Sequence, residues 1–142
     1  MSLKVHFTVS TILGLILGLV FQSYLIGILS WLVGWIIDCD HLFDYLVYLL
    51  KSGNKPNLKE FFSTTFFGKL GKIYVLAHAW EYLFIFLVVG LYKLSFPFVV
   101  AIGFSYGLHL FLDQFVNITN PWVYFLLYRI KVGFSTNKLC GS

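Results

Sequence analysis

The chain has 142 residues, of which 59% are hydrophobic and only 11% are charged, and its formal net charge is +4. A soluble domain carries roughly 25% charged residues, so this composition excludes an ordinary water-soluble domain. The positive charge does not indicate a nucleic-acid partner, because the basic residues flank apolar segments, where they set topology and meet anionic lipid headgroups. The two cysteines, Cys39 and Cys140, lie too far apart to predict a disulfide framework or a zinc ribbon.

Four apolar stretches are predicted to cross a membrane, since a crossing helix needs about 20 apolar residues. They cover residues 5–21, 24–50, 73–94 and 98–116, and short polar or proline-containing turns separate the first from the second and the third from the fourth. The sequence therefore predicts an all-α fold, an integral membrane four-helix bundle in which residues 1–142 form a single transmembrane domain.

Two shorter segments, residues 59–71 and 122–132, are aromatic and basic, and we expect them to form interfacial helices. Orientation follows from the basic residues, which are enriched on the cytoplasmic side of membrane proteins. If the N-terminus is cytoplasmic, nine of the ten Lys and Arg residues lie inside and Lys93 alone lies outside. The sequence therefore predicts that both termini lie inside.

Ionisable residues are concentrated in the apolar helices. Of the six acids and four histidines, only Glu60 belongs to a loop region. The others are His6, Asp38, Asp40, His41, Asp44, His78, Glu81, His109 and Asp113. An acid at the centre of a bilayer costs roughly 2.5–3.5 kcal/mol on insertion scales. No lysine lies in the same stretches, so a divalent cation is the compensating partner that we expect.

Depth along the predicted helices supports a shared site. Counted from the outer end of each helix, five of these residues lie about 13–17 positions in, which at 1.5 Å per residue is roughly 20–25 Å. They are His6, Asp38, His78, His109 and Asp113. Unrelated structural polar residues are not expected to share one level. This level lies near the cytoplasmic boundary of the hydrocarbon.

The spacing of ionisable residues within single helices is that of paired metal ligands. His109 and Asp113 are four residues apart and share a helix face. His78 and Glu81 are three residues apart, an arrangement used in helical di-metal sites.

The second predicted helix carries four polar residues, which is more than can face one ion from a single side of the helix. On a regular helix its four polar residues spread over about 160° of arc. Either the helix is distorted there, or some of the four serve a second metal or support other ligands. These residues are Asp38, Asp40, His41 and Asp44.

These residues predict one or two divalent ions, zinc first and manganese or iron next, because mixed imidazole and carboxylate ligands suit these metals. If such an ion activates water for hydrolysis, we expect Glu81 to act as general base, with Asp44 as second choice. The level of the site near the lipid headgroups favours a lipid-like or other amphiphilic ester or phosphoester as substrate. The expected ligands are His6, Asp38, Asp40, His41, His78, His109 and Asp113.

The order of these motifs resembles the small membrane-bound metal-dependent hydrolases of bacteria and archaea, the YdjM-type inner-membrane proteins. The likeness covers nearly the whole chain and rests on His6, which opens the first helix, on Asp38-Cys39-Asp40-His41, on Asp44 and His78, and on His109 with Asp113. The resemblance implies hydrolase activity and a prokaryotic inner (plasma) membrane location.

Two other functions stay open on the sequence. A divalent-metal carrier or sensor also needs ligands on several helices, although an ion pathway requires polar groups at several depths. A structural membrane protein could use the cluster only to fix helix register. Membrane lipids are expected partners in each case, and a homodimer is possible.

Overall fold

The computed structural model describes residues 3–116 and 120–140, and within these ranges the chain is all-helical, with no β-strand. The predicted all-α class is confirmed. In chain order the helices and 3-10 turns are α1 (Leu3–Val20), α2 (Tyr24–Ile36), η1 (Ile37–Cys39), α3 (Asp40–Ser52), α4 (Leu58–Ser63), α5 (Phe66–Leu70), α6 (Trp80–Lys93), α7 (Phe96–Val116), η2 (Pro121–Tyr124), α8 (Leu126–Lys131) and α9 (Thr136–Leu139).

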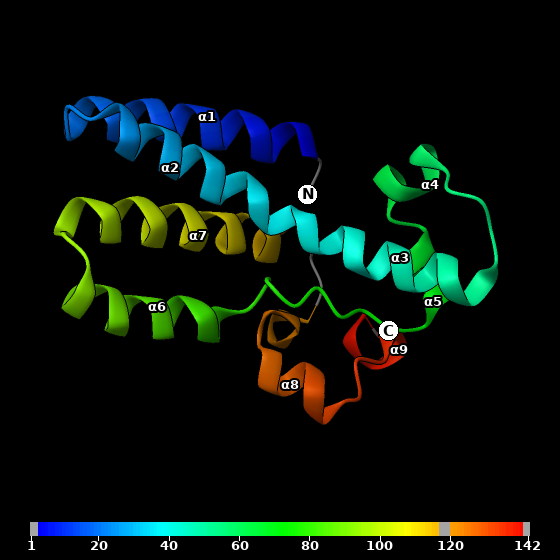
Figure 1. Cartoon of the computed structure of the whole chain (residues 1–142). Coiled ribbons are helices and arrows are strands. Elements are labelled where there is room, and N and C mark those ends of the chain that lie inside the picture. Colours follow the sequence, from blue (N-terminus) through cyan, green and yellow to red (C-terminus); the bar gives the residue numbers. More distant parts are fainter. Residues whose placement is uncertain (1–2, 117–119, 141–142) are drawn as a thin grey trace.

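Four helices lie side by side in the order α1, α2, α7, α6 (Figure 1). Helix α1 packs on α2, both of them contact α7, and α6 packs on α7. The α1–α2 turn and the α6–α7 turn lie at one end of this group, and the shorter helices α4, α5, α8 and α9 lie toward the other end (Figure 1). The N-terminus of α1, the middle of the α2–α3 rod and the C-terminus of α7 therefore meet in one region.

Glycines allow α1 and α2 to approach closely. A Cβ atom added to Gly14 would lie 2.8 Å from the carbonyl oxygen of Gly27, and one added to Gly27 would lie 2.9 Å from the carbonyl oxygen of Gly14. Gly18 lies against Gly27 as well, so the small residues at i and i+4 of α1 serve packing within the chain. Ser23 caps the following helix, because its hydroxyl accepts from the backbone N–H of Ile26 at 3.4 Å.

The interior of the four-helix group is apolar and also contains a small polar contact between α2 and α7. Leu13, Leu17, Ile26 and Ala101 form its buried core. Ser30 of α2 and Ser105 of α7 are buried, with their hydroxyl oxygens 2.6 Å apart, so each satisfies the other between the two helices.

Two helices are long and apolar enough to cross a membrane by length and composition. They are Tyr24–Ser52, which joins α2, η1 and α3 into one rod of 29 residues, and Phe96–Val116, with 21 residues; Val5–Val20 is a shorter apolar helix. The four-crossing bundle predicted from the sequence remains a prediction.

The predicted helix over residues 73–94 differs from the structure. The helix α6 begins at Trp80, and residues 72–79 have no helical structure. His78 therefore does not share a helix with Glu81. The segment is held by long-range contacts, described below, which local helix propensity does not predict.

The predicted interfacial segments are helical but short. Residues 59–71 form α4 and α5, and residues 122–132 form most of η2 and α8. Phe66 of α5 is fully buried against Tyr45 and Tyr48 of α3, so this region has an aromatic cluster of its own. The tail also forms a helix, α9, whose Leu139 is fully buried.

Candidate metal centre

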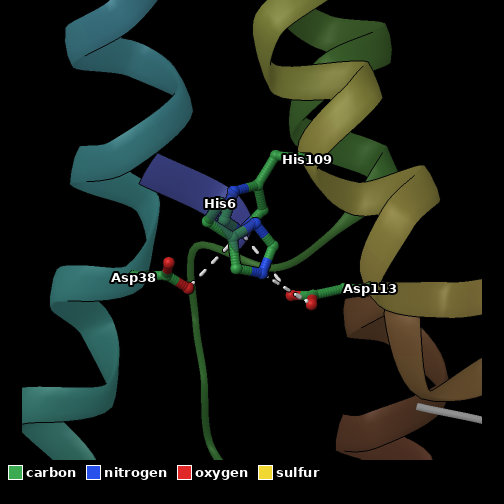
Figure 2. Close-up of side chains that lie close together, drawn as sticks. All are labelled: His6, Asp38, His109 and Asp113. Carbon is green, nitrogen blue, oxygen red and sulfur yellow. Dashed lines mark hydrogen bonds and ion pairs between the residues drawn. The ribbon is translucent and has the colours of Figure 1, made fainter. Parts of the chain in front are cut away.

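Side chains from three parts of the chain converge on one point, as Figure 2 shows. They are His6 from α1, Asp38 from η1, and His109 with Asp113 from α7, and their ligand atoms all lie within 4.8 Å of one another. The Nε2 atom of His6 lies 2.9 Å from Asp113 Oδ1, and the rings of His6 and His109 stack with centroids 4.1 Å apart. Three of the four are only 3% exposed: His6, His109 and Asp113.

His78 joins this group from the non-helical segment. Its Nε2 atom lies 3.2 Å from His109 Nε2, 3.3 Å from Asp113 Oδ2 and 3.6 Å from Asp38 Oδ1. Five of the seven expected ligands thus present nitrogen or oxygen atoms to one small volume, although they come from four separate segments of the chain.

Outer hydrogen bonds fix how the two central imidazoles are turned. The Nδ1 atom of His109 lies 3.0 Å from the carbonyl oxygen of Gly34, and Nδ1 of His78 lies 3.0 Å from Asp40 Oδ2. Both partners are acceptors, so each Nδ1 carries the hydrogen and each neutral ring has a lone pair at Nε2. This is the arrangement in which a metal-binding histidine is oriented by a carbonyl or carboxylate behind it.

The spacing of the ligand atoms fits a bound metal ion. Ligands about 2.0–2.1 Å from a tetrahedral zinc lie about 3.3 Å from one another. His109 Nε2 lies 3.5 Å from Asp38 Oδ1 and 3.5 Å from Asp113 Oδ2, and the contacts of His78 fall in the same range. Asp38 Oδ2 is buried and has no hydrogen-bond partner among the described residues. The buried His and Asp cluster could therefore hold a metal ion.

Carboxylates of α3 secure the segment that carries His78. Asp44 is fully buried, and its Oδ2 accepts from the backbone N–H groups of Tyr74 at 3.1 Å and Val75 at 2.9 Å. Asp40 Oδ2 accepts from the N–H of Ala77 at 2.8 Å as well as from the His78 ring. These acceptors replace the bonds that a helix would have made, which buried backbone requires.

Val75 has a positive φ of 32°. A β-branched residue adopts that region only where the surroundings hold it, and such strain concentrates at functional sites. Here the side chain of Asp44 fixes the N–H of Val75, and Arg129 binds its carbonyl oxygen. The strain lies three residues before His78.

Arg129 of α8 holds the carbonyl side of the same segment. It is fully buried, and its guanidinium donates to the carbonyl oxygens of Tyr74, Val75 and His78. Its place in the sequence predicts only a basic residue that sets topology. One signal was available: it is the single arginine among nine lysines, and only arginine offers a planar fork of donors. The Tyr106 hydroxyl adds bonds to backbone carbonyls of the segment.

Glu81, the expected general base, binds backbone instead of facing the cluster. Its two carboxylate oxygens accept from the N–H groups of Leu126 and Leu127, each at 3.0 Å, at the start of α8. Glu81 thereby places the helix that carries Arg129. Neither Glu81 nor Asp44 is among the residues that line the cavity described next.

A cavity of about 630 Å³ opens beside the cluster. Its walls are largely apolar, with aromatic side chains from α2, α4 and α5, and both cysteines reach it. His6, Asp38, His41, His78 and Asp113 line its polar side, whereas His109 does not line it. The candidate metal centre therefore has one face toward a space large enough for a small organic group.

A separate ion pair lies on α4 and α5, outside the predicted membrane helices. Lys69 Nζ lies 2.6 Å from Glu60 Oε1. This bond holds the pKa of the Glu60 carboxyl below its ordinary value and the pKa of the Lys69 amine above its ordinary value. Lys69 does not line the cavity beside the metal centre.

Comparisons with protein-family models, curated proteins and solved structures give no match to this chain. The function is therefore argued from the site alone.

Proposed function

We propose that this protein is a membrane-embedded, metal-dependent hydrolase that acts on a lipid-like or other amphiphilic ester or phosphoester. One observation carries the proposal. Imidazole nitrogens and carboxylate oxygens from four segments of the chain converge at spacings that suit a divalent ion, and they do so at the wall of a largely apolar cavity. The order of the motifs, which resembles YdjM-type membrane hydrolases, points to the same class.

The proposed membrane domain is a bundle of α1, the α2–α3 rod, α6 and α7. Apolar side chains on these helices face outward, which in water would be unfavourable and in lipid is not. Leu19, for example, is 79% exposed and Tyr92 is 86% exposed. With both termini in the cytoplasm of a prokaryotic cell, the cluster lies near the cytoplasmic headgroups and the cavity opens on that side.

The ion would be held by His6, Asp38, His109 and Asp113, with His78 beside them. Zinc suits this set best, and manganese and iron are the next choices. A divalent ion at this place supplies Lewis-acid chemistry and lowers the pKa of a bound water to about 7.

The protein's own groups have distinct tasks. Asp40 holds the His78 ring and, together with Asp44, the backbone around it. Glu81 acts through α8 as a positioning residue and not as the base. Asp38 Oδ2 has no hydrogen-bond partner among residues 3–116 and 120–140, so both oxygens of this carboxylate would be available to a bound ion.

The cavity favours an amphiphilic substrate. Trp35, Phe61, Phe62 and Phe67 line it, and no Lys or Arg is among its described lining residues. An acyl or aromatic group fits these walls, while the bond to be cleaved lies at the polar side. Access from the lipid headgroup level would let such a molecule enter without leaving the membrane.

The test begins with metal content and ends with turnover. Detergent-purified wild type is compared with His109→Ala/Asp113→Ala, and with Phe111→Ala as control, because Phe111 lies between them on α7 and is 48% exposed. We expect bound zinc, manganese or iron in the wild type and control, and the loss of an ion in the double variant with helicity retained. Nitrophenyl esters and phosphodiesters of increasing chain length then test hydrolysis.

Two outcomes would overturn the proposal. Wild-type protein that binds no metal after supplementation, with its fold intact, would leave only a polar cluster that fixes helix register. Metal-loaded protein that cleaves none of these substrates but carries metal into proteoliposomes would be a carrier.

A further inference from the structure

A second group of potential ligands lies beside the first, and all of its residues line the cavity. It consists of Asp38, His41 and His78, whose ligand atoms also lie within 4.8 Å of one another. His41 Nε2 lies 3.7 Å and His78 Nε2 lies 3.6 Å from the same oxygen, Asp38 Oδ1. The two groups therefore share Asp38.

The 3-10 turn η1 explains why Asp38 and His41 face the same way. In a regular α-helix residues three apart differ by about 60° in direction, whereas in a 3-10 helix they are eclipsed. The switch at Ile37–Cys39 brings His41 toward the side on which Asp38 points. The helix distortion that the sequence left open is thus present, and it gathers polar groups that a regular helix would spread.

The two groups differ in ligand number and in burial: every residue of the second group lines the cavity, whereas His109 of the first group does not. The group of His6, Asp38, His109 and Asp113 has four residues, and three of them are buried. The group of Asp38, His41 and His78 has three residues, and the His41 side chain, 27% exposed, lines the cavity. Four protein ligands are typical of closed structural sites, and three with an open position are typical of catalytic sites.

Polar atoms of the second group lack partners that their burial demands. His41 Nδ1 and Asp38 Oδ2 are buried, and neither has a hydrogen-bond partner among the described residues. The ring of His41 stacks on that of His78 with centroids 5.0 Å apart and an interplanar angle of 22°. Such groups are costly to bury unless something else satisfies them.

We infer that the protein holds two unequal divalent ions that share Asp38: one enclosed by the four protein ligands of the first group, and an exchangeable one on the cavity side, bound by Asp38, His41 and His78, all of which line the cavity. The inference rests on the proposed function for the presence of metal, and it adds which ion meets the substrate. The cavity-side ion has an open coordination position for the substrate. Its ligand His41 is therefore needed for activity but not for binding of the enclosed ion.

Metal content of His41→Ala tests this directly. We expect two ions per chain in the wild type and one in His41→Ala. Phe67→Leu is the matched control, because Phe67 contacts the His41 ring and lines the cavity but offers no ligand atom. It should keep both ions. A brief chelator treatment of the wild type should remove one ion quickly and leave the other.

Manganese gives a readout independent of activity. Two Mn²⁺ ions that share a carboxylate are magnetically coupled, so the wild type should show a coupled electron paramagnetic resonance spectrum. His41→Ala should show the spectrum of an isolated ion, and Phe67→Leu should resemble the wild type.

The outcomes separate this inference from the proposed function. One ion in the wild type that His41→Ala retains would overturn the second site and leave a one-metal hydrolase. Two ions that both persist in His41→Ala would also overturn it. No metal in either protein would overturn the proposed function itself.

Discussion

The Nε2 atoms of His78 and His109 lie 3.2 Å apart, while each ring uses its Nδ1 for a bond to an oxygen. With hydrogens on both Nδ1 atoms, two lone pairs face each other. Only cations bound at these lone pairs, or an additional proton, make this contact favourable. The fold thus brings together groups that need a positive partner, which is the physical basis for expecting metal to stabilise the protein.

Removal of metal should lower stability. A ligand present at 100 times its dissociation constant adds about 2.7 kcal/mol to the free energy of unfolding if it binds only the folded state. We expect a chelator to lower the thermal midpoint of detergent-purified wild type and zinc to restore it. Asp38→Asn should show little response, because it loses the carboxylate shared by both groups. Equal midpoints with and without metal in the wild type would contradict this.

Arg129→Met should destabilise the protein by about 3 kcal/mol, because it removes charged donors from buried carbonyl oxygens around His78. Arg129→Lys should recover only part of the loss, since lysine lacks the planar fork. Lys131→Met is the control, two residues along α8 and exposed, and should change the free energy of unfolding by less than about 0.5 kcal/mol. Chemical unfolding in mixed micelles measures the stability of all three variants. Equal losses for Arg129→Met and Lys131→Met would show that Arg129 does not hold the backbone around His78.

Glu81→Ala should cost about 1 kcal/mol, as expected for a lost helix-capping carboxylate, and Glu81→Gln less, because the amide oxygen still accepts one bond. Metal content at saturation should stay as in the wild type. Unfolding and metal analysis check this. A loss of turnover beyond tenfold in Glu81→Gln, with stability and metal unchanged, would restore the proton-transfer role expected from the sequence.

Gly27→Ala should destabilise the protein by roughly 1–3 kcal/mol, because the new methyl group meets the carbonyl oxygen of Gly14 at 2.9 Å. Gly68→Ala is its control in α5: a Cβ there meets nothing within 4 Å, and alanine favours helix by roughly 0.5–1 kcal/mol. The two variants should shift the unfolding midpoint in opposite directions. A neutral Gly27→Ala would mean that α1 and α2 are not in this close contact.

Topology is testable with cysteines. In a Cys39→Ser background, Cys140 reports the cytoplasmic side, and a Cys140→Ser/Ser95→Cys variant reports the α6–α7 turn, where Ser95 is exposed. A membrane-impermeant maleimide should label the Ser95 site in spheroplasts and Cys140 only after lysis. Burial raises the pKa of the Cys140 thiol, so a denatured sample sets full labelling. The reverse pattern would overturn the proposed orientation.

Sequence reasoning predicted the features that depend on local pattern. Helix positions followed from apolar length, and the shared level of His6, Asp38, His109 and Asp113 followed from counting along helices, because rise per residue is constant. These residues do converge.

The segment around His78 could not be predicted in this way. Nothing in Ala77-His78-Ala79 breaks a helix, and the segment is irregular because side chains remote in sequence bind its backbone, namely Asp40, Asp44, Tyr106 and Arg129. Long-range bonds to backbone N–H groups also occupy the carboxylates of Asp44 and Glu81, the two residues expected to act as base. The partner of a carboxylate depends on the tertiary structure. The residue type alone therefore does not decide whether Asp44 or Glu81 acts as a base or accepts hydrogen bonds from backbone N–H groups.

The dependence of the His78 segment on Arg129 sets the order in which the protein becomes competent during synthesis. Every expected metal ligand has been translated once Asp113 is made, yet the guanidinium that secures His78 emerges only later, with α8. At roughly 5–20 residues per second, the ribosome separates these events by about one to three seconds. A chain released early could insert its apolar helices and still lack a settled metal centre. Metal loading would then mark the finished polypeptide and distinguish it from truncated products in the same membrane.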